Sequence, residues 1–235
     1  MNILCTICAR GGSSNLKNKN LKLVNGHPLI AYTVKQAVNS KLFKNIIIST
    51  DSVKIKNIAI KYGASSIFVR PNKLSNNTAG KLDVIKHALI KAESYFNYKY
   101  DYVCDLDVTS PLREISDIKL AFKTFRKFDS DNLFSVISAR KNPYFNIIKK
   151  KNNSFLPVSP LKKIVFRRQD APKVFEMNAS IYFWKRKSLL NSNSVFLKNT
   201  SIYKMNEYAI DIDNKYDFEF INSIVKKYKK WQIKI

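Results

Sequence analysis

Residues 3–20 read ILCTICARGGSSNLKNKN, an apolar run that breaks into glycines and ends among cations. Ile3–Cys8 has the length and composition of a short buried strand. The glycines that follow allow backbone N–H groups to approach anionic oxygens, and Arg10 and Lys19 bring positive charge to the same place. Such a stretch forms either a phosphate-binding loop or a plain turn after a strand. It matches neither GxxxxGK[ST] nor GxGxxG, because the glycine pair lacks the third glycine of the second pattern.

Segments of strand and helix character alternate along the rest of the chain. This alternation indicates an α/β fold, a doubly wound and mostly parallel sheet with helices on both faces. Ligands of such sheets bind beyond the carboxyl ends of the strands. The expected strands are 3–8, 45–49, 66–69, 100–106, 133–138, 178–184 and 201–205. The expected helices are 29–40, 53–62, 78–96, 115–128 and 216–230.

Residues 140–175 interrupt this alternation. They contain four prolines and few periodic apolar runs, which predicts an excursion of hairpins and loops. Excursions of this kind serve as oligomerisation arms or lids. With 235 residues and no low-complexity linker, the chain is expected to form one domain, 1–235, that carries this excursion.

Composition excludes several classes of protein. A hydrophobic content of 45% is that of a globular chain rather than a disordered one, and no apolar run is long enough for a membrane span. The net charge of +25 comes from lysines scattered along the chain, without the aromatic and basic patterns of nucleic-acid-binding modules. It therefore indicates anionic small molecules rather than nucleic acid as ligands. Three cysteines beside strand-like runs predict free thiols and a cytoplasmic protein.

Two pairs of carboxylates stand out in so basic a chain. Asp211 and Asp213 are separated by one residue, so in an extended segment both side chains can face one Mg²⁺ ion. Alternatively, Asp213 only caps the closing helix. Asp105 and Asp107 have the same spacing at the end of an expected strand, which resembles the DxD motif of nucleotide-sugar glycosyltransferases.

Eight segments, in order along nearly the whole chain, together resemble the CMP-sugar synthetases, the acylneuraminate cytidylyltransferase family. They are ICARGGS with KNKN (7–20), GHPLIAYTV (26–34), IIISTDS (46–52), RP with Leu74 (70–74), TSPLR (109–113), RRQ (167–169), NASIY (178–182) and IDID (210–213). The Asp-Leu-Asp-Val segment before TSPLR looks most like the branch that acts on legionaminic acid. TSPLR is also expected to bring Arg113 to the rim of the site.

The resemblance implies that the anomeric hydroxyl of an acidic nine-carbon sugar attacks the α-phosphorus of CTP, that pyrophosphate leaves, and that a CMP-sugar forms. It implies Mg²⁺ as cofactor and a homodimer built through 140–175. The nucleotide-binding residues it implies are Ala9, Arg10, Gly11, Gly12, Ser13, Lys19, Asn20 and Arg70. The implied catalytic residues are Arg10, Lys19 and Asp211, and the implied metal ligands are Asp211 and Asp213. The sugar-binding residues it implies are Asp107, Arg168 and Tyr182, although Tyr182 can equally be a core residue.

The chain departs from the family pattern at three places. Ser14-Asn15 replace a Lys-Gly pair whose lysine reaches the triphosphate, Asp107 replaces a glutamine, and Ala179 replaces a glycine. The added carboxylate must bind metal, pair with an arginine, or recognise a different group of the sugar. Two other functions stay open at this point: a glycosyltransferase that uses Asp105 and Asp107, and a weakly active relative that binds nucleotide.

Overall fold

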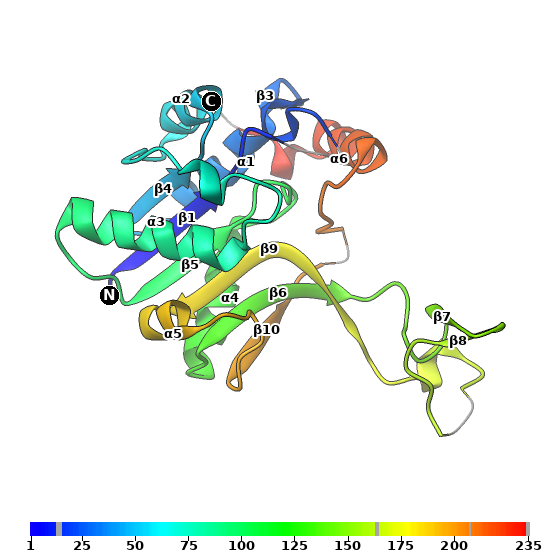
Figure 1. The fold of residues 1–235 in the computed structure, drawn as a ribbon. Helices are drawn as coiled ribbons and strands as arrows, with labels where there is room; N and C mark the ends of the chain where they lie inside the picture. Colours follow the sequence, from blue (N-terminus) through cyan, green and yellow to red (C-terminus); the bar gives the residue numbers. More distant parts are fainter. Residues whose placement is uncertain (13–15, 163–164, 207, 234–235) are drawn as a thin grey trace.

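The computed structural model describes residues 1–12, 16–162, 165–206 and 208–233. Within these residues, one central sheet holds strands in the order β10-β6-β9-β5-β1-β4 (Figure 1). β9 is antiparallel to both of its neighbours, and the other strands are parallel to one another. The strands are β1 (Ile3–Cys8), β4 (Asn45–Ser49), β5 (Tyr102–Leu106), β6 (Asn132–Ser138), β9 (Phe175–Lys185) and β10 (Thr200–Lys204). The mostly parallel α/β sheet expected from the sequence is thus confirmed.

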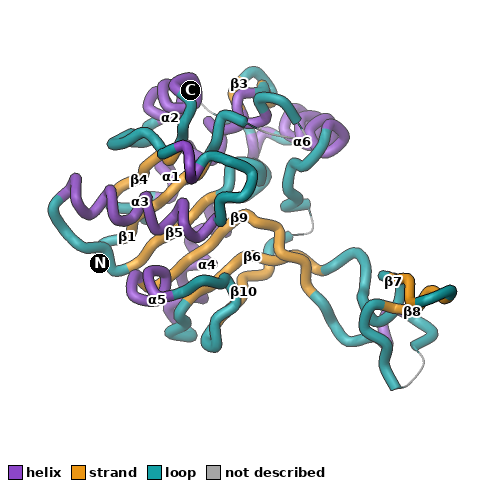
Figure 2. The backbone as a smooth tube through the Cα atoms, viewed as in Figure 1, coloured by secondary structure: helices purple, strands orange, loops and turns teal. Residues whose placement is uncertain are grey.

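Helices cover both faces of the sheet, as the doubly wound fold requires (Figure 2). Buried side chains of α1, α2, α4 and α6 belong to the core on one face, and those of α3 and α5 to the core on the other. These helices are α1 (Leu29–Ser40), α2 (Val53–Tyr62), α3 (Lys81–Phe96), α4 (Ile115–Lys127), α5 (Arg186–Asn191) and α6 (Lys215–Lys227). Short elements complete the fold: η1 (Lys19–Leu21), β2 (Leu23–Val24), β3 (His27–Pro28), η2 (Asn72–Leu74) and η4 (Lys229–Trp231).

The expected strand 66–69 is wrong. Only Ser65 bridges the edge strand β4, through its hydrogen bonds with Ile46 and Ile48. The chain then leaves the sheet, and Ile67 and Phe68 pack against the core beneath α3. The apolar and β-branched residues of this segment reflect its partial burial. Composition alone does not distinguish a partly buried loop from a strand.

The three cysteines are free thiols, as expected. Cys5 belongs to the core on one face of the sheet, while Cys8 packs against the core on the other. Alternate residues of a strand face opposite sides, so the CxxC spacing does not bring these sulfurs together. Burial is the main cause that raises the pKa of both thiols.

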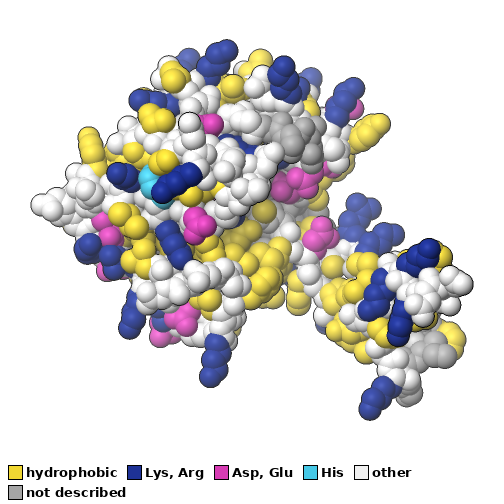
Figure 3. Space-filling model, in the orientation of Figure 1, with side chains coloured by type: hydrophobic (Ala, Val, Ile, Leu, Met, Phe, Trp, Pro, Cys, Tyr) yellow, Lys and Arg dark blue, Asp and Glu magenta, His cyan; other side chains and the backbone are white. Residues whose placement is uncertain are grey.

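Residues 140–175 form an arm that projects from the body of the molecule (Figure 1). It carries the hairpin of β7 (Ile148–Lys151) and β8 (Ser154–Pro157), followed by η3 (Arg168–Asp170). Lysines and arginines are spread over the visible face of both the body and the arm, rather than gathered in one stripe (Figure 3). Of the helices that the structure describes, none combines the length and the apolar character needed to cross a membrane.

Candidate active site

The candidate site lies at one edge of the sheet, where β1, β4 and β5 end. Because these strands are parallel, the residues that follow them meet there, as Cys8 paired with Ser49 illustrates. A pocket of about 280 Å³ opens at this edge. Its lining residues are Cys8, Arg10, Arg70, Leu74, Asn76, Asn77, Ala79, Lys81, Val84 and Asp107.

The glycine loop after β1 is held against the start of α2. The backbone N–H of Gly11 donates a 2.8 Å hydrogen bond to Asp51 Oδ1, and a Cβ atom at position 11 would lie 3.2 Å from Ser52 Cβ. Position 11 therefore favours glycine because the loop approaches α2 closely. The contact of Gly11 with phosphate stays a prediction, and it requires that phosphate replace the Asp51 carboxylate, which accepts the hydrogen bond of this N–H here.

The other predicted loop residues surround this turn. Ala9 is buried, Gly12 is exposed, and Ser13 lies outside the described residues together with Ser14 and Asn15. Asn20 donates from Nδ2 to the carbonyl oxygen of Arg10 at 3.1 Å, so its side chain ties the two ends of the loop together.

Lys19 connects the loop to the carboxylate pair near the C-terminus. Its Nζ donates a 2.6 Å hydrogen bond to the carbonyl oxygen of Ile212, which lies between Asp211 and Asp213. The N–H of Ile212 in turn donates to the carbonyl oxygen of Thr109 at 2.9 Å. Segments from three distant parts of the chain thus form one site, and its cations and carboxylates lie side by side.

Asp211 has an environment that disfavours the ionised form of its carboxyl group. Its Oδ1 atom is buried and has no hydrogen-bond partner among the described residues. Burial, followed by the negative charge of Asp107, raises the pKa of Asp211 from 3.8 to about 6. A buried carboxylate oxygen without a partner fits a cation that is bound during function.

Asp213 is exposed and does not cap the closing helix. Asn214 caps α6, because its side chain accepts hydrogen bonds from the N–H groups of Tyr216 and Asp217. The helix-cap alternative for Asp213 is therefore wrong. No group of three or more His, Cys, Asp or Glu side chains in the described part of the chain could hold a metal ion. A pair of carboxylates nevertheless fits Mg²⁺, which often takes its remaining ligands from substrate phosphates and water.

Two arginines line the pocket beside Lys81. Arg10 donates from Nη1 to Asn77 Oδ1. Arg70 is only 4% exposed, and its guanidinium donates from Nε to Ser49 Oγ at 3.0 Å and from Nη2 to the Ser49 carbonyl oxygen. Arg70 is thus fixed by the end of β4, while Arg10 is held by an exposed side chain.

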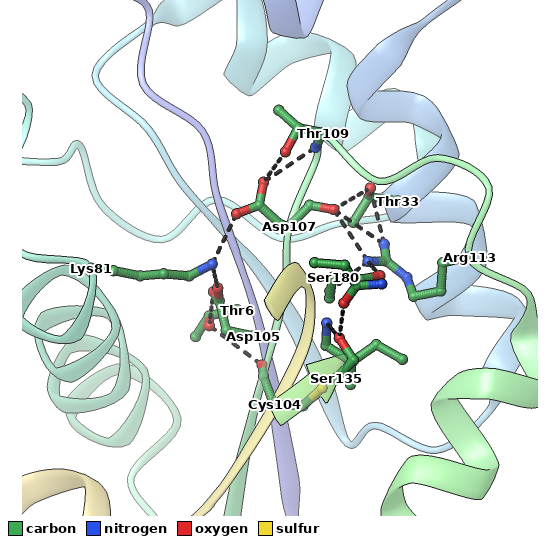
Figure 4. A network of polar contacts seen from close by, with 12 residues as sticks. Thr6, Thr33, Lys81, Cys104, Asp105, Asp107, Thr109, Arg113, Ser135 and Ser180 are labelled. Atoms are coloured by element: carbon green, nitrogen blue, oxygen red, sulfur yellow. Dashed lines mark hydrogen bonds and ion pairs between the residues drawn. The ribbon is translucent and has the colours of Figure 1, made fainter. Parts of the chain in front are cut away.

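Asp105 and Asp107 both face Lys81, on the α3 side of the sheet (Figure 4). Asp105 is 1% exposed and accepts a 2.7 Å hydrogen bond from Thr6 Oγ1. A DxD motif needs both carboxylates on a metal that also meets the sugar donor, whereas Asp105 is buried beneath Lys81. The geometry contradicts the glycosyltransferase alternative. Of the three alternatives for Asp107, pairing with a cation is the one that the structure shows, and the cation is Lys81 rather than an arginine.

Arg113 does not reach the rim, contrary to expectation. It is 1% exposed, and its Nη1 donates to the Ser180 carbonyl oxygen at 2.7 Å. Nη2 donates to Thr33 Oγ1 at 3.1 Å, and both nitrogens lie 3.3 Å from the Asp107 carbonyl oxygen (Figure 4). Nη2 also donates to Gln36 Oε1 at 2.9 Å. Arg113 therefore holds the backbone of Asp107 from behind, since the guanidinium is the group that satisfies several carbonyls at once.

The remaining two predicted sugar-binding residues, Tyr182 and Arg168, do not line the pocket, although the Tyr182 ring lies behind the ammonium group of Lys81. Tyr182 is 6% exposed and stacks on Trp184, with ring centroids 5.5 Å apart, so its placement favours the core alternative. Arg168 is exposed on the arm, where its Nη2 donates to the Ala139 carbonyl oxygen. It lines a separate hollow of about 640 Å³ with Ser138, Asn142 and Lys204. Within one chain, the structure does not bring Arg168 to the strand-end pocket.

Two residues of the site were not predicted from the sequence: Asp51 and Lys81. Asp51 lies two residues after the end of β4, much as Asp107 follows the end of β5, and this is the signal that could have found it. Lys81 begins a helix, where a cation is unusual because the helix dipole disfavours it.

Comparison with known proteins places these features in context. A family model described as cytidylyltransferase matches residues 4–232. The chain is 46% identical over 226 residues to the post-translational flagellin modification protein B of Campylobacter coli, covering 96% of this chain and 95% of that protein. It is also 46% identical over 224 residues to the CMP-N,N'-diacetyllegionaminic acid synthase of Campylobacter jejuni, covering 95% and 94% of the two chains. A solved CMP:2-keto-3-deoxy-manno-octonic acid synthetase complexed with CTP shares the fold, with a TM-score of 0.72, 15% identity, and coverage of 97% of this chain and 99% of that one.

Proposed function

The chain belongs to the cytidylyltransferase family and is a nucleotidyltransferase, and from this premise we propose that it transfers CMP from CTP to a nonulosonic acid. The anomeric hydroxyl of the sugar acid attacks the α-phosphorus, the bond to the pyrophosphate oxygen breaks, and pyrophosphate leaves. The relative named as a CMP-N,N'-diacetyllegionaminic acid synthase supports a diacetylated legionaminic acid as the first substrate to test.

One observation supports this function above the others. The 2.6 Å hydrogen bond from Lys19 to the Ile212 carbonyl oxygen joins a cationic loop to a pair of carboxylates. Transfer of a nucleotidyl group needs both: cations that neutralise the triphosphate, and carboxylates that hold a divalent ion beside it. The two parts come from opposite ends of the chain, yet they meet at one edge of the sheet.

Each residue has a role in this proposal. Arg10 and Lys19 bind phosphate oxygens, together with the N–H of Gly12. Asn20 orders this loop, and Arg70 holds the nucleotide from the end of β4. Asp51 keeps the loop closed until the triphosphate competes for the N–H of Gly11.

Asp211 and Asp213 would hold Mg²⁺, because Oδ1 of Asp211 is buried without a partner among the described residues and the exposed Asp213 follows two residues later in the same segment. A divalent ion held there would supply positive charge that polarises the α-phosphate and would favour deprotonation of the attacking hydroxyl. Lys19, whose Nζ contacts the backbone between these carboxylates, limits their repulsion before the ion arrives.

The arm supports a homodimer. Several large apolar side chains of the arm are solvent-exposed in the single chain, Phe155 at 65% and Phe166 at 81% among them. Ile148, Leu156 and Phe175 are exposed beside them. Burial of this surface against a second copy would remove it from water. In such a dimer, Arg168 on the arm of one copy would contact the carboxylate of the sugar acid bound by the other copy.

The three free thiols fit a cytoplasmic enzyme.

The test is pyrophosphate release. Purified protein is incubated with CTP, Mg²⁺ and, in turn, legionaminic, pseudaminic, sialic and shorter 2-keto-3-deoxy sugar acids. We expect release with a nonulosonic acid and loss on the order of a hundredfold in Asp211→Ala. Asp129→Ala removes an exposed carboxylate elsewhere and is the matched control. No release with any sugar acid from folded protein would refute the function, and a fully active Asp211→Ala would refute its role.

A further inference from the structure

The ammonium group of Lys81 lies between two carboxylates and an aromatic ring. Its Nζ is 2.8 Å from Asp107 Oδ2 and 3.3 Å from Asp105 Oδ2 (Figure 4). The centroid of the Tyr182 ring lies 4.2 Å from the same atom. Lys81 is the first residue of α3, where the helix dipole favours an anion and disfavours a cation. A lysine at this position makes the start of the helix less stable. Its role therefore lies in the contacts of its ammonium group.

Lys81 is an ion-pair partner of both Asp105 and Asp107, and its charge controls the pKa of Asp107. Burial alone would raise the pKa of Asp107, but the charge of Lys81 outweighs burial and lowers that pKa to about 2. Burial also acts to lower the pKa of Lys81, and the charges of Asp107 and Asp105 outweigh it, so the pKa of the lysine is raised. At neutral pH the pocket therefore holds an ionised Asp107 and a protonated Lys81. Without the ammonium, Asp107 and the buried Asp105 would lose the ion-pair partner that they have among the described residues, while an anionic sugar binds beside them.

Hydrogen-bonding capacity remains on both partners. Asp107 Oδ1 accepts bonds from the N–H and the hydroxyl of Thr109, at 3.2 and 2.9 Å, which fixes the orientation of the carboxylate. Oδ2 accepts from Lys81, so one lone pair of Oδ2 is left. An ammonium has three protons, and Lys81 donates one of them to Asp107, while Asp105 Oδ2 lies within ion-pair distance without a hydrogen bond. Both side chains line the pocket, which thus offers a donor beside an acceptor.

We propose that Lys81 is a positioning residue for the sugar acid: it neutralises Asp107, holds it in place, and offers its remaining N–H to a polar oxygen of the sugar. This inference rests on the proposed function, because it names the group that prepares the sugar side of the same site. Asp107 offers Oδ2 to a hydroxyl or amide N–H of the sugar. The cations assigned to the nucleotide are Arg10, Lys19 and Arg70, so loss of Lys81 should affect the sugar acid much more than CTP.

The experiment compares Lys81→Met with Lys91→Met. Lys91 is exposed on the same helix, and its replacement changes the net charge equally. With the sugar acid that the wild type uses, we expect the KM for the sugar to rise at least tenfold in Lys81→Met, and the KM for CTP to change less than threefold. Lys91→Met should leave both values within twofold. Equal changes of the two KM values in Lys81→Met, or none, would overturn the proposal.

A second variant tests the charge balance. In Lys81→Met/Asp107→Asn, an uncompensated carboxylate is removed together with the ammonium, so the KM for the sugar should recover at least threefold from that of Lys81→Met. Absence of recovery overturns the proposal. If Lys81→Met does not fold, Lys81→Gln keeps a donor without the charge and should still raise the KM for the sugar several-fold. An unchanged KM there also overturns it. A wild type that releases no pyrophosphate would instead refute the proposed function.

Discussion

Replacement of Asp211 by asparagine should stabilise the metal-free protein while it removes activity. Burial and the charge of Asp107 raise the pKa of Asp211 from 3.8 to about 6. The difference between these values corresponds to at most about 3 kcal/mol of folding free energy, lost when the carboxylate is ionised in the folded state. Because the side chain is partly exposed, solvent screens some of this, and we expect a gain of about 1–3 kcal/mol in Asp211→Asn at pH 8.

The pH dependence follows from the direction of the shift. A group whose pKa is raised in the folded state favours folding while it is protonated. The contribution of Asp211 to stability is fully present below its unfolded pKa of 3.8 and is lost as the pH rises through about 6. The advantage of Asp211→Asn over the wild type should therefore be small at pH 4 and reach its full size by pH 8.

Urea unfolding in EDTA, followed by circular dichroism from pH 4 to pH 8, measures this difference. In a domain of this size the gain corresponds to a rise in melting temperature of roughly 2–12 °C. Asp213→Asn is the matched control, since Asp213 belongs to the same motif but is exposed. If both variants gain equally, or if the gain of Asp211→Asn does not depend on pH, the buried carboxylate is not the source of strain and the reasoning fails.

Three further predictions concern stability, all measured by urea unfolding. Arg113→Lys should lose about 2–4 kcal/mol, because an ammonium cannot satisfy the carbonyls that the buried guanidinium holds; a loss below 1 kcal/mol would contradict this. Ala179→Gly should gain about 0.5–1 kcal/mol, since φ is 51° at position 179, and a loss would show that its methyl group packs usefully. For Glu93, burial acts to raise the pKa, but the hydrogen bond from Arg186 outweighs it and lowers the pKa from 4.5. Its stabilisation is present above pH 4.5 and lost as the pH falls, so Glu93→Gln should lose about 1–3 kcal/mol at pH 7 and little at pH 3; a loss that does not depend on pH would contradict this.

Local sequence determined most of the secondary structure. The helices at 29–40 and 53–62 have the boundaries that were predicted, because a residue such as Gly63 at a helix end, or an apolar residue every three or four positions, acts within a few residues. The strand order was not accessible in this way. β9 enters the sheet between β5 and β6 in the antiparallel direction, and no local pattern specifies which strands become its neighbours.

The candidate site divides in the same manner. From sequence alone, the glycine loop and the pair Asp211 and Asp213 could be recognised as chemical groups, since their composition and spacing are local properties. Their surroundings could not be. Asp51 accepts the hydrogen bond of the Gly11 N–H across 40 residues of the chain. Lys81 donates to Asp107 across 26 residues.

Arg113 is the clearest case. Its sequence, TSPLR at the end of a strand, predicted a cation at the rim, whereas the guanidinium is buried against Ser180 and the backbone of Asp107. The sequence by itself determined that this region would be charged and polar. Only the tertiary structure decided which charges meet the pocket and which are buried, because that depends on β9 being placed beside β5, and a buried guanidinium is stable only where several carbonyls converge on it.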